Sequence, residues 1–358
     1  MSAAPTVAPP RPAGLNWRDT VDEAIRTLRA NRLTAVGFLL VVFAVLLALL
    51  VLGVPFVSGL LGHPTTIVPY NPNGLSDDRL QGPSWWPWLT DPGRWLTSAP
   101  NFSHLLGTDE LGQDVFSRVL VALPLDLWIG IVITGLAVII GGGLGLVAGF
   151  WDAPGTVGRW VSAIILRVTD VFLAFPTLVL AFALAAILGR NLNATIAALT
   201  ITWWPYYVRL IRGEVLAIKH QGYIPAARIA GASELRILAR HVLRNLLEPL
   251  TVYATLDVGT VIVTFSTISY FGISLPETTP EWGSMVFQYQ SFLPTYLYLV
   301  LAPGLAIFVT VLGFSLLGDG MRDVLDPRTR RAYARVKREL PAPMVMPEGS
   351  VPDPSSRR

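Results

Sequence analysis

The stretch LTAVGFLLVVFAVLLALLVLGV (residues 33–54) contains no charged residue. At a rise of about 1.5 Å per residue, a helix of this length crosses a hydrocarbon core of about 30 Å. A secretory signal would have a shorter apolar region followed by a small-residue cleavage site. We therefore expect an uncleaved first membrane span at 33–54, preceded by a cytoplasmic segment, 1–32, whose Pro- and Ala-rich beginning is expected to be disordered.

The composition of the whole chain agrees with a membrane protein. Of the 358 residues, 52% are hydrophobic and only 14% are charged, whereas soluble domains carry about 25% charged residues. The chain has no cysteine, which excludes disulfides, cysteine-ligated zinc and thiol catalysis. Its four histidines show no metal-ligand spacing. We expect no metal site and no catalytic residue.

Five more apolar runs follow the first. They are centred on 127–150, 168–188, 194–211, 249–271 and 297–317. Pro176 falls inside one of these runs and should kink it, which membrane helices tolerate when neighbours satisfy the freed carbonyls. The GGGLG sequence of 141–145 predicts a close helix-packing face. The expected fold is an all-α integral membrane protein with six transmembrane helices.

Positive charge is distributed unequally about these spans. If the N-terminus is cytoplasmic, only Arg79, Arg94, Arg118 and Arg190 of the 27 Lys and Arg residues lie outside. This bias follows the positive-inside rule, and six spans place both termini in the cytoplasm. The predicted segments after the first span are an external loop at 55–118, a five-helix core at 119–320 with a cytoplasmic loop at 212–245, and a basic cytoplasmic tail at 321–358.

The cytoplasmic loop 212–245 has the pattern of two short helices. Residues 223–230 are good helix formers with a proline near the start, where its missing N–H is tolerated. Gly231 breaks this helix, and Ser233 is a suitable N-cap for a second one with Glu234 in its first turn. The loop is therefore expected to form a helix, a glycine hinge and an amphipathic helix that continues into span five.

The second helix of the loop carries two stripes. The basic stripe comprises Arg236, Arg240 and Arg244, and the apolar stripe comprises Leu235, Leu238 and Val242. One interpretation is an interfacial helix whose arginines contact lipid phosphates. The other is a docking surface for a soluble protein, in which Ala226, Ala227 and Gly231 allow close approach and the arginines set the register. The residue pattern alone leaves both open.

This loop resembles the EAA loop of permease subunits of binding-protein-dependent ABC importers, through Ala226, Ala227 and Gly231. Four other segments are similar, in the same order, to signatures of the C-type permeases of the dipeptide, oligopeptide and nickel branch. They are HLLGTDELGQDVFSRVL (104–120), DVFLAFPTLVLA (170–181), SYFGISLPETTPEWG (269–283) and LLGDGMRDVLDPRTR (316–330). The residues that depart from the family pattern are Gln113, Asp126, Arg244 and Phe265.

The resemblance implies the type I ABC importer permease fold and alternating access in the bacterial inner membrane. The implied partners are a second, non-identical permease, two ATPase subunits, an extracytoplasmic substrate-binding protein and membrane lipid, with no nucleic acid. The residues implied to dock on the ATPase are Tyr223, Ala226, Ala227, Arg228, Gly231, Ser233, Arg236 and Arg240. The residues implied to face the binding protein, in the loop 271–296, are Glu277, Glu281 and Trp282.

The chain is not expected to be its own motor. A phosphate-binding loop of the Walker A type needs a lysine directly after glycine. The only lysines are Lys219 and Lys337, and neither has this context. We therefore expect no enzymatic activity and no cofactor bound by this chain, with ATP and Mg²⁺ on the partner ATPase subunits.

Ionisable residues within spans are costly and are candidates for function. Asp257 lies near the middle of span five. Together with Tyr253 and Ser269 it could line the translocation path and meet the ammonium group of a peptide; alternatively, it is hydrogen-bonded at a helix interface. The sequence leaves both open. Arg167 and Asp170, three residues apart, are expected to form an ion pair.

Two other functions are alternatives to an import permease for peptides or a related small solute. An ion-gradient-driven secondary transporter or channel usually shows inverted repeats and paired broken helices, and the sequence shows no clear repeat. A membrane-embedded enzyme needs a convergent set of acid, base or nucleophile, which the sequence does not show. The identity of the transported solute does not follow from the sequence.

Overall fold

The computed structural model describes residues 31–60, 65–85, 103–153, 155–276 and 278–325. The helices in these ranges are α2 (Arg32–Leu60), α4 (Val115–Phe150), α5 (Val157–Leu173), α6 (Thr177–Leu188), α7 (Leu192–Lys219), α8 (Tyr223–Ile229), α9 (Glu234–Ile237), the π-helix η2 (Leu238–Val242), α10 (Leu243–Tyr270), α11 (Trp282–Tyr289), the 3₁₀-helix η3 (Gln290–Phe292) and α12 (Leu297–Leu325). The described part contains one isolated β-bridge, between Thr108 and Asp114. The predicted all-α class is confirmed.

In the part of the chain that the structure describes, four helical segments are long and apolar enough to cross a membrane. They are Arg32–Leu60, Val115–Phe150, Glu234–Tyr270 and Leu297–Arg322. A fifth span is added if α5 and α6, which are bent by 88° at the break before Thr177, form one broken span. The kink predicted at Pro176 is therefore a complete break, with Pro176 as the N-cap of α6. The predicted fourth span forms α7, which does not reach the same apolarity, so the count of six stays a prediction.

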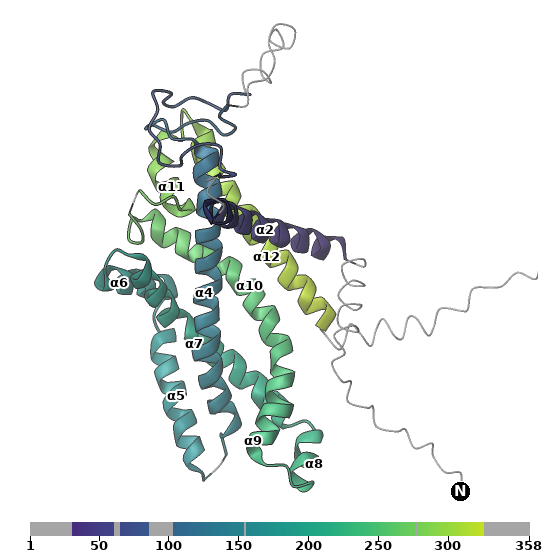
Figure 1. Cartoon of the computed structure of the whole chain (residues 1–358). Helices are drawn as coiled ribbons and strands as arrows, with labels where there is room; N and C mark the ends of the chain where they lie inside the picture. Colours follow the sequence, from purple (N-terminus) through teal and green to yellow (C-terminus); the bar gives the residue numbers. More distant parts are fainter. Residues whose placement is uncertain (1–30, 61–64, 86–102, 154, 277, 326–358) are drawn as a thin grey trace, which may run out of the picture.

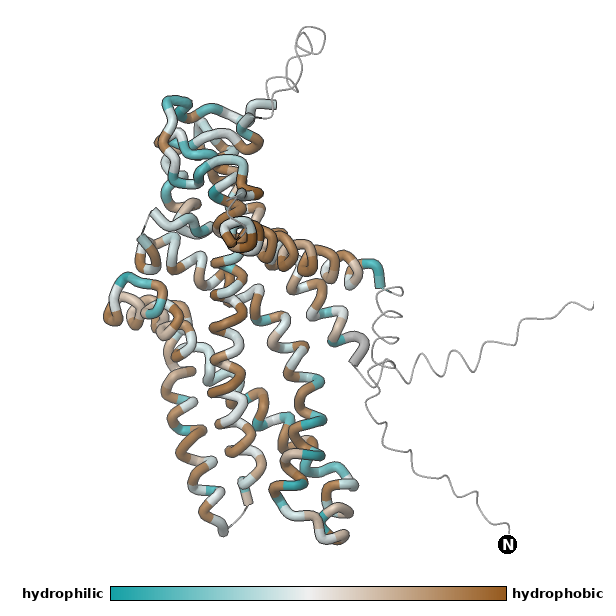
Figure 2. Tube along the Cα trace, in the orientation of Figure 1, coloured by the Kyte–Doolittle hydropathy of each residue, from teal (hydrophilic) through white to brown (hydrophobic). Residues whose placement is uncertain are grey.

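The helices are arranged around α4, which runs almost the whole length of the molecule (Figure 1). Helices α5 and α7 lie beside its lower half, and α2 crosses its upper half next to α12. Helices α8 and α9 lie at one end, with the turn between α4 and α5, and α11 lies at the other. Apolar residues dominate α2 and α6, while polar residues gather at the α11 end (Figure 2).

Two of the long helices begin at side chains that accept backbone hydrogen bonds. The Asp114 carboxylate accepts from the N–H of Ser117 at 2.8 Å, at the start of α4. The Asn191 amide oxygen accepts from the N–H of Ala194 at 2.9 Å, at the start of α7. These caps satisfy donors that the first turn of a helix leaves free.

Helix α4 approaches α7 through glycines spaced four residues apart. A Cβ atom at Gly141 would lie 2.2 Å from the carbonyl oxygen of Trp204, and one at Gly145 would lie 2.7 Å from that of Val208. By contrast, Gly143 has no such neighbour within 4 Å. The predicted packing face is confirmed, and it is confined to the glycines one helical turn apart.

Helix α11 is held against α4 by two buried acids. The Glu281 carboxylate accepts from the N–H groups of Gly283 at 2.7 Å and Ser284 at 2.8 Å, and so caps α11. The carboxylate of Asp126, on α4, accepts from the N–H of Trp282 at 3.2 Å. Both acids are buried, so the start of α11 is fixed to the middle helix of the bundle.

Replacing Gly141 by alanine should lower the free energy of unfolding by about 1–3 kcal/mol, the usual cost of overpacking a tight contact. The matched control is Gly143→Ala, which adds the same methyl group in open space and removes a helical glycine, so it should be neutral or slightly stabilising. Thermal unfolding of the purified protein in detergent measures both. Equal midpoints for the two variants would contradict the glycine contact.

Stability should also depend on pH through Glu281. Burial raises the pKa of Glu281 from its ordinary 4.5 to about 7. The folded protein therefore keeps a proton that the unfolded chain releases, so stability falls as pH rises from 4.5 to about 7. Unfolding midpoints of the wild type and Glu281→Gln across this range test the effect. The variant should give the flatter profile, and superimposable profiles would refute the assignment.

Candidate functional site

The candidate site is the tip formed by α8, α9 and the turn between them, which is anchored to the bundle by apolar side chains. Ile224 of α8 is fully buried. The buried residues of the same cluster are Phe150, Ile211, Val215, Ile218, Ile237, Val242 and Leu246. The tip is therefore packed against α4, α7 and the beginning of α10.

Polar contacts at the end of α7 add to this anchoring. The Lys219 Nζ atom donates to the carbonyl oxygens of Gly149 at 3.0 Å and Phe150 at 2.6 Å, at the end of α4. Burial lowers the pKa of Lys219, and the charge of Arg228 lowers it further. The two hydrogen bonds place the Lys219 ammonium group at the carboxyl end of α4, where the helix dipole favours a positive charge.

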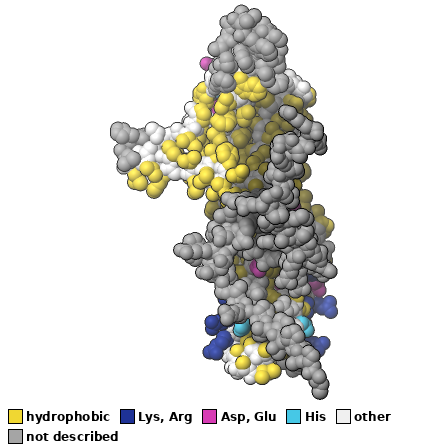
Figure 3. Space-filling model, turned by 90° about the vertical axis from the view of Figure 1, so that its right-hand side faces the viewer, with side chains coloured by type: hydrophobic (Ala, Val, Ile, Leu, Met, Phe, Trp, Pro, Cys, Tyr) yellow, Lys and Arg dark blue, Asp and Glu magenta, His cyan; other side chains and the backbone are white. Residues whose placement is uncertain are grey.

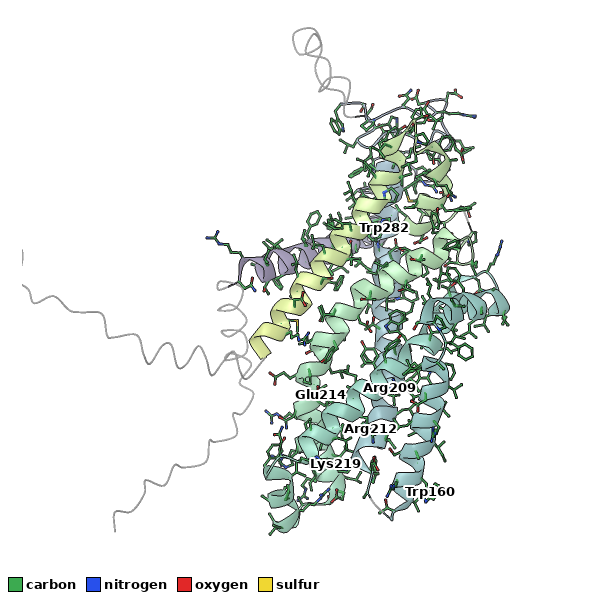
Figure 4. The ribbon with its side chains drawn as sticks, turned by 180° about the vertical axis from the view of Figure 1, so that it is seen from behind. Trp160, Arg209, Arg212, Glu214, Lys219 and Trp282 are labelled. Atoms are coloured by element: carbon green, nitrogen blue, oxygen red, sulfur yellow. The ribbon has the colours of Figure 1, made fainter. Side chains whose placement is uncertain are left out.

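Further from the tip along α7, two arginines connect this helix to its neighbours. Arg209 forms an ion pair with Asp170 of α5 at 2.7 Å, and Arg212 forms one with Asp152 at 2.9 Å. The predicted pair between Arg167 and Asp170 is therefore wrong, because Asp170 is paired across helices. Figure 4 shows Arg209, Arg212 and Lys219 in succession along α7 towards the tip.

The glycine hinge between α8 and α9 is a Schellman motif. Gly231 has φ +82°, a conformation that glycine adopts without penalty. Its N–H donates to the carbonyl of Arg228, and the N–H of Ala232 donates to that of Ala227, each at 3.0 Å. The predicted hinge at Gly231 is present, and these bonds define its geometry.

An ion pair closes the same turn. Arg228 donates through Nε to Glu234 Oε1 at 2.8 Å and through Nη2 to Oε2 at 3.0 Å. Two parallel bonds of this kind give a defined geometry. Arg228 was predicted to contact an ATPase, whereas here its guanidinium is bound within the loop.

Tyr223, at the start of α8, is also bound within this region. Its hydroxyl accepts a hydrogen bond from Asn245 Nδ2 at 3.1 Å, and burial raises the pKa of Tyr223.

The second helix begins as predicted but does not continue smoothly. Ser233 Oγ accepts from the N–H of Arg236 at 3.4 Å, which confirms Ser233 as the N-cap of α9. The single turn of π-helix η2 then inserts one extra residue. The buried positions of the segment from α9 to the start of α10 are Ile237, Val242 and Leu246, which are five and four residues apart. The predicted apolar stripe is therefore wrong at Leu235, which is 70% exposed.

Two large apolar side chains project from the tip on either side of Gly231. Ile229 is 89% exposed and Leu235 is 70% exposed. Ala226, Arg236 and Arg240 are also exposed, and Ala227 is half-buried. Figure 3 shows hydrophobic side chains at this end of the molecule, with Lys and Arg side chains on both sides. No pattern in the sequence indicates a role for Ile229, because its exposure follows from the conformation of the hinge at Gly231.

The second candidate region is the face of α10 that contains Asp257. Asp257 Oδ2 accepts from Trp203 Nε1 at 2.7 Å and from Tyr207 Oη at 2.8 Å, both on α7. Asp257 is therefore hydrogen-bonded at a helix interface, as one of the two interpretations expected, and it is also partly exposed. Tyr253 is partly exposed as well, whereas Ser269 is buried.

The residues predicted to face a binding protein are placed differently. Trp282 is 1% exposed and its Nε1 donates to the carbonyl of Val119 at 3.1 Å. Glu281 is also buried, so the predicted outward placement of both residues is wrong, while Glu277 lies outside the described residues. Figure 4 shows Trp282 near the opposite end of the molecule from Lys219.

Residues 104–120 make the contacts that hold the loop before α4 against α11. The Asp109 carboxylate accepts from the N–H groups of Leu111 at 2.9 Å and Gln113 at 2.8 Å. Tyr289 of α11 donates its hydroxyl to the same carboxylate at 3.1 Å. Arg118 Nη2 lies 3.3 Å from Gln288 Oε1. Within the described ranges no group of His, Asp and Glu is placed to hold a metal ion.

The chain is similar to known components of membrane transport systems. The dipeptide transport system permease protein DppC of Alkalihalophilus pseudofirmus is 34% identical over 88% of this chain and 90% of its own length. The probable D,D-dipeptide transport system permease protein DdpC of Escherichia coli is 40% identical over 68% of this chain and 81% of its own. A solved inward-facing structure of the MetNI methionine ABC transporter is 20% identical, with a TM-score of 0.46, over 56% of this chain and 93% of that chain. Residues 141–331 match the family model described as the inner membrane component of binding-protein-dependent transport systems. The chain belongs to this family of inner membrane transport components.

Proposed function

We propose that this permease subunit forms part of a translocation path for peptides and is driven by separate ATPase subunits that bind the α8–α9 tip. The observation that carries the proposal is the pair of exposed apolar side chains, Ile229 and Leu235, on a turn that is itself rigid. Buried apolar anchors surrounded by charged residues are typical of protein interfaces. The relatives named as dipeptide permeases support a peptide as the cargo.

In this proposal the tip lies in the cytoplasm and its movement is transmitted to α10. Helices α9, η2 and α10 are continuous from Glu234 to Tyr270. The buried side chains of Ile237 and Val242 join the start of this segment to Ile224 of α8. A displacement of the tip by ATP-driven closure of the ATPases would therefore displace the face of α10 that contains Asp257.

The proposed assembly contains a second, non-identical permease, two ATPase subunits and an extracytoplasmic substrate-binding protein at the α11 end, within membrane lipid. ATP and Mg²⁺ would bind the ATPase subunits, and this chain would bind no cofactor and catalyse no reaction. The two lysines of the sequence support this division, because neither has the context of a phosphate-binding loop. In this assembly the tip has a defined partner, the ATPase surface.

The docking role is tested by Ile229→Asp and Leu235→Asp in the complete transporter. Each change should reduce co-purification of the ATPase subunits and uptake of a labelled dipeptide by about tenfold or more, as expected for interface anchors. Both side chains are mostly exposed, so membrane insertion should be unaffected. The control for ATPase association is Leu75→Asp, because Leu75 is 74% exposed on the loop before α4, at the other end of the molecule. It should leave co-purification of the ATPase subunits unchanged. Normal ATPase association in both tip variants would contradict the docking role.

Exchanging the charges of Arg228 and Glu234 tests whether Arg228 acts within the loop, through Glu234, or by direct contact with the ATPase. Arg228→Glu alone should impair coupling, because it places two carboxylates in the hinge. Adding Glu234→Arg restores the pair with reversed charges and should recover part of the uptake. The recovery should be incomplete, because the exchange also reverses the favourable positions of both charges at helix ends. A double variant as inactive as Arg228→Glu would show that Arg228 acts on a partner instead.

A further inference from the structure

The carboxylate of Asp257 is held at one oxygen only. Trp203 and Tyr207 both donate to Oδ2, and among the described residues Oδ1 accepts no hydrogen bond. The ion pairs join other residues, so no Lys or Arg among the described residues neutralises this acid. A carboxylate in a membrane helix is costly unless it is paired. The side chain is therefore oriented by α7, and it is ready to accept a cation at Oδ1.

The surface of α10 around Asp257 offers further acceptors and few donors. Along this helix, Thr260 donates to the carbonyl of Leu256 at 3.4 Å and Thr264 donates to that of Thr260 at 2.9 Å. Because each hydroxyl proton is used within the helix, the oxygen lone pairs remain for a ligand. Thr260 is exposed, and it lies one helical turn from Asp257.

Aromatic side chains of α7 orient the carboxylate. Trp203 and Tyr207, which donate to Oδ2, are themselves buried. Tyr206, the exposed ring of the same turn, is hydrogen-bonded instead to Thr177 of α6. Among the described residues, the Trp203 Nε1 and Tyr207 hydroxyl protons are already given to Asp257, so this surface favours a cation over an anion.

We propose that Asp257, with the acceptor oxygens of α10, forms a subsite for a protonated primary amine of the cargo. This subsite rests on the proposed function for its peptide cargo and names the group that the path recognises, the free amino terminus. Trp203 and Tyr207 are positioning residues, because they orient the carboxylate through Oδ2 and leave Oδ1 for the ammonium group.

The first test is uptake of trialanine and N-acetyl-trialanine by the complete transporter in proteoliposomes. Asp257→Asn keeps an amide oxygen that can accept from Trp203 and Tyr207, so the helix contact survives. This variant should take up trialanine about tenfold more slowly, the loss expected for one hydrogen bond to a charged group. Its uptake of the acetylated peptide should equal that of the wild type. Equal effects on both peptides, or none, would overturn the subsite.

The second test does not depend on the cargo and uses the absence of cysteine in this chain. Thr260→Cys, in a complex with cysteine-free partners, is modified by a cationic and by an anionic methanethiosulfonate reagent. Asp257→Asn should lower the ratio of the cationic to the anionic rate about tenfold. The control Glu248→Gln removes an exposed acid of the same helix more than two turns away, and it should leave the ratio unchanged. An unchanged ratio in Asp257→Asn would overturn the proposal. If the wild type takes up neither peptide, the proposal of a peptide cargo is wrong. The ratio of modification rates then tests by itself whether the Asp257 carboxylate attracts a cation.

Discussion

The close contact between α4 and α7 is the constraint on which the rest of the structure depends. The absence of side chains at Gly141 and Gly145 lets the two backbones approach, which no larger residue would allow. The same contact places Lys219 within hydrogen-bond distance of the last carbonyls of α4. It also fixes Tyr207, which is 2% exposed, so that its hydroxyl meets Asp257. The packing of α4 against α7 thus determines both the position of Lys219 beside the tip and the orientation of Asp257 on α10.

The tip combines a rigid interior with an apolar exterior. The left-handed conformation of Gly231 ends α8, and the paired charges of Arg228 and Glu234 join the two sides of the turn. An exposed ion pair contributes little stability by itself. Its importance here is geometric, because it holds Ile229 and Leu235 in fixed positions on the outside. Apolar side chains in fixed positions on a rigid turn suit a surface through which a bound partner moves the tip.

Much of the fold was predictable because it follows from local physical rules. The apolar run 33–54 requires a helix in lipid, Ser233 is a good N-cap, and Pro176 cannot continue a helix without loss of a hydrogen bond. Each of these features appears at the predicted residue. The family was predictable from five short motifs in order. The apolar pattern is a weaker guide to the number of spans, since α7 has aromatic and charged residues in place of a plain apolar run.

The errors concern contacts that no local pattern contains. The buried face of α9 was assigned to Leu235 because a period of 3.6 residues was assumed, whereas the π-helix shifts it to Ile237. Glu281 appeared to be an exposed loop acid, but it caps α11 inside the fold. Likewise, the two donors to Asp257 lie about fifty residues earlier in the chain. Such pairings follow from the tertiary fold alone.

In the proposed transporter, the tip and α10 move as one rigid body when the ATPases close. Spin labels at Ala230 and Thr260, introduced through cysteines in the assembled transporter, report the distance between the tip and the face of α10 that contains Asp257 by pulsed electron resonance. Rigid-body movement predicts the same distance distribution in the nucleotide-free and ATP-trapped states, while the accessibility of the label at Thr260 changes between them. A shift of the distance distribution between the two states would contradict rigid-body movement, because the tip would then move independently of α10.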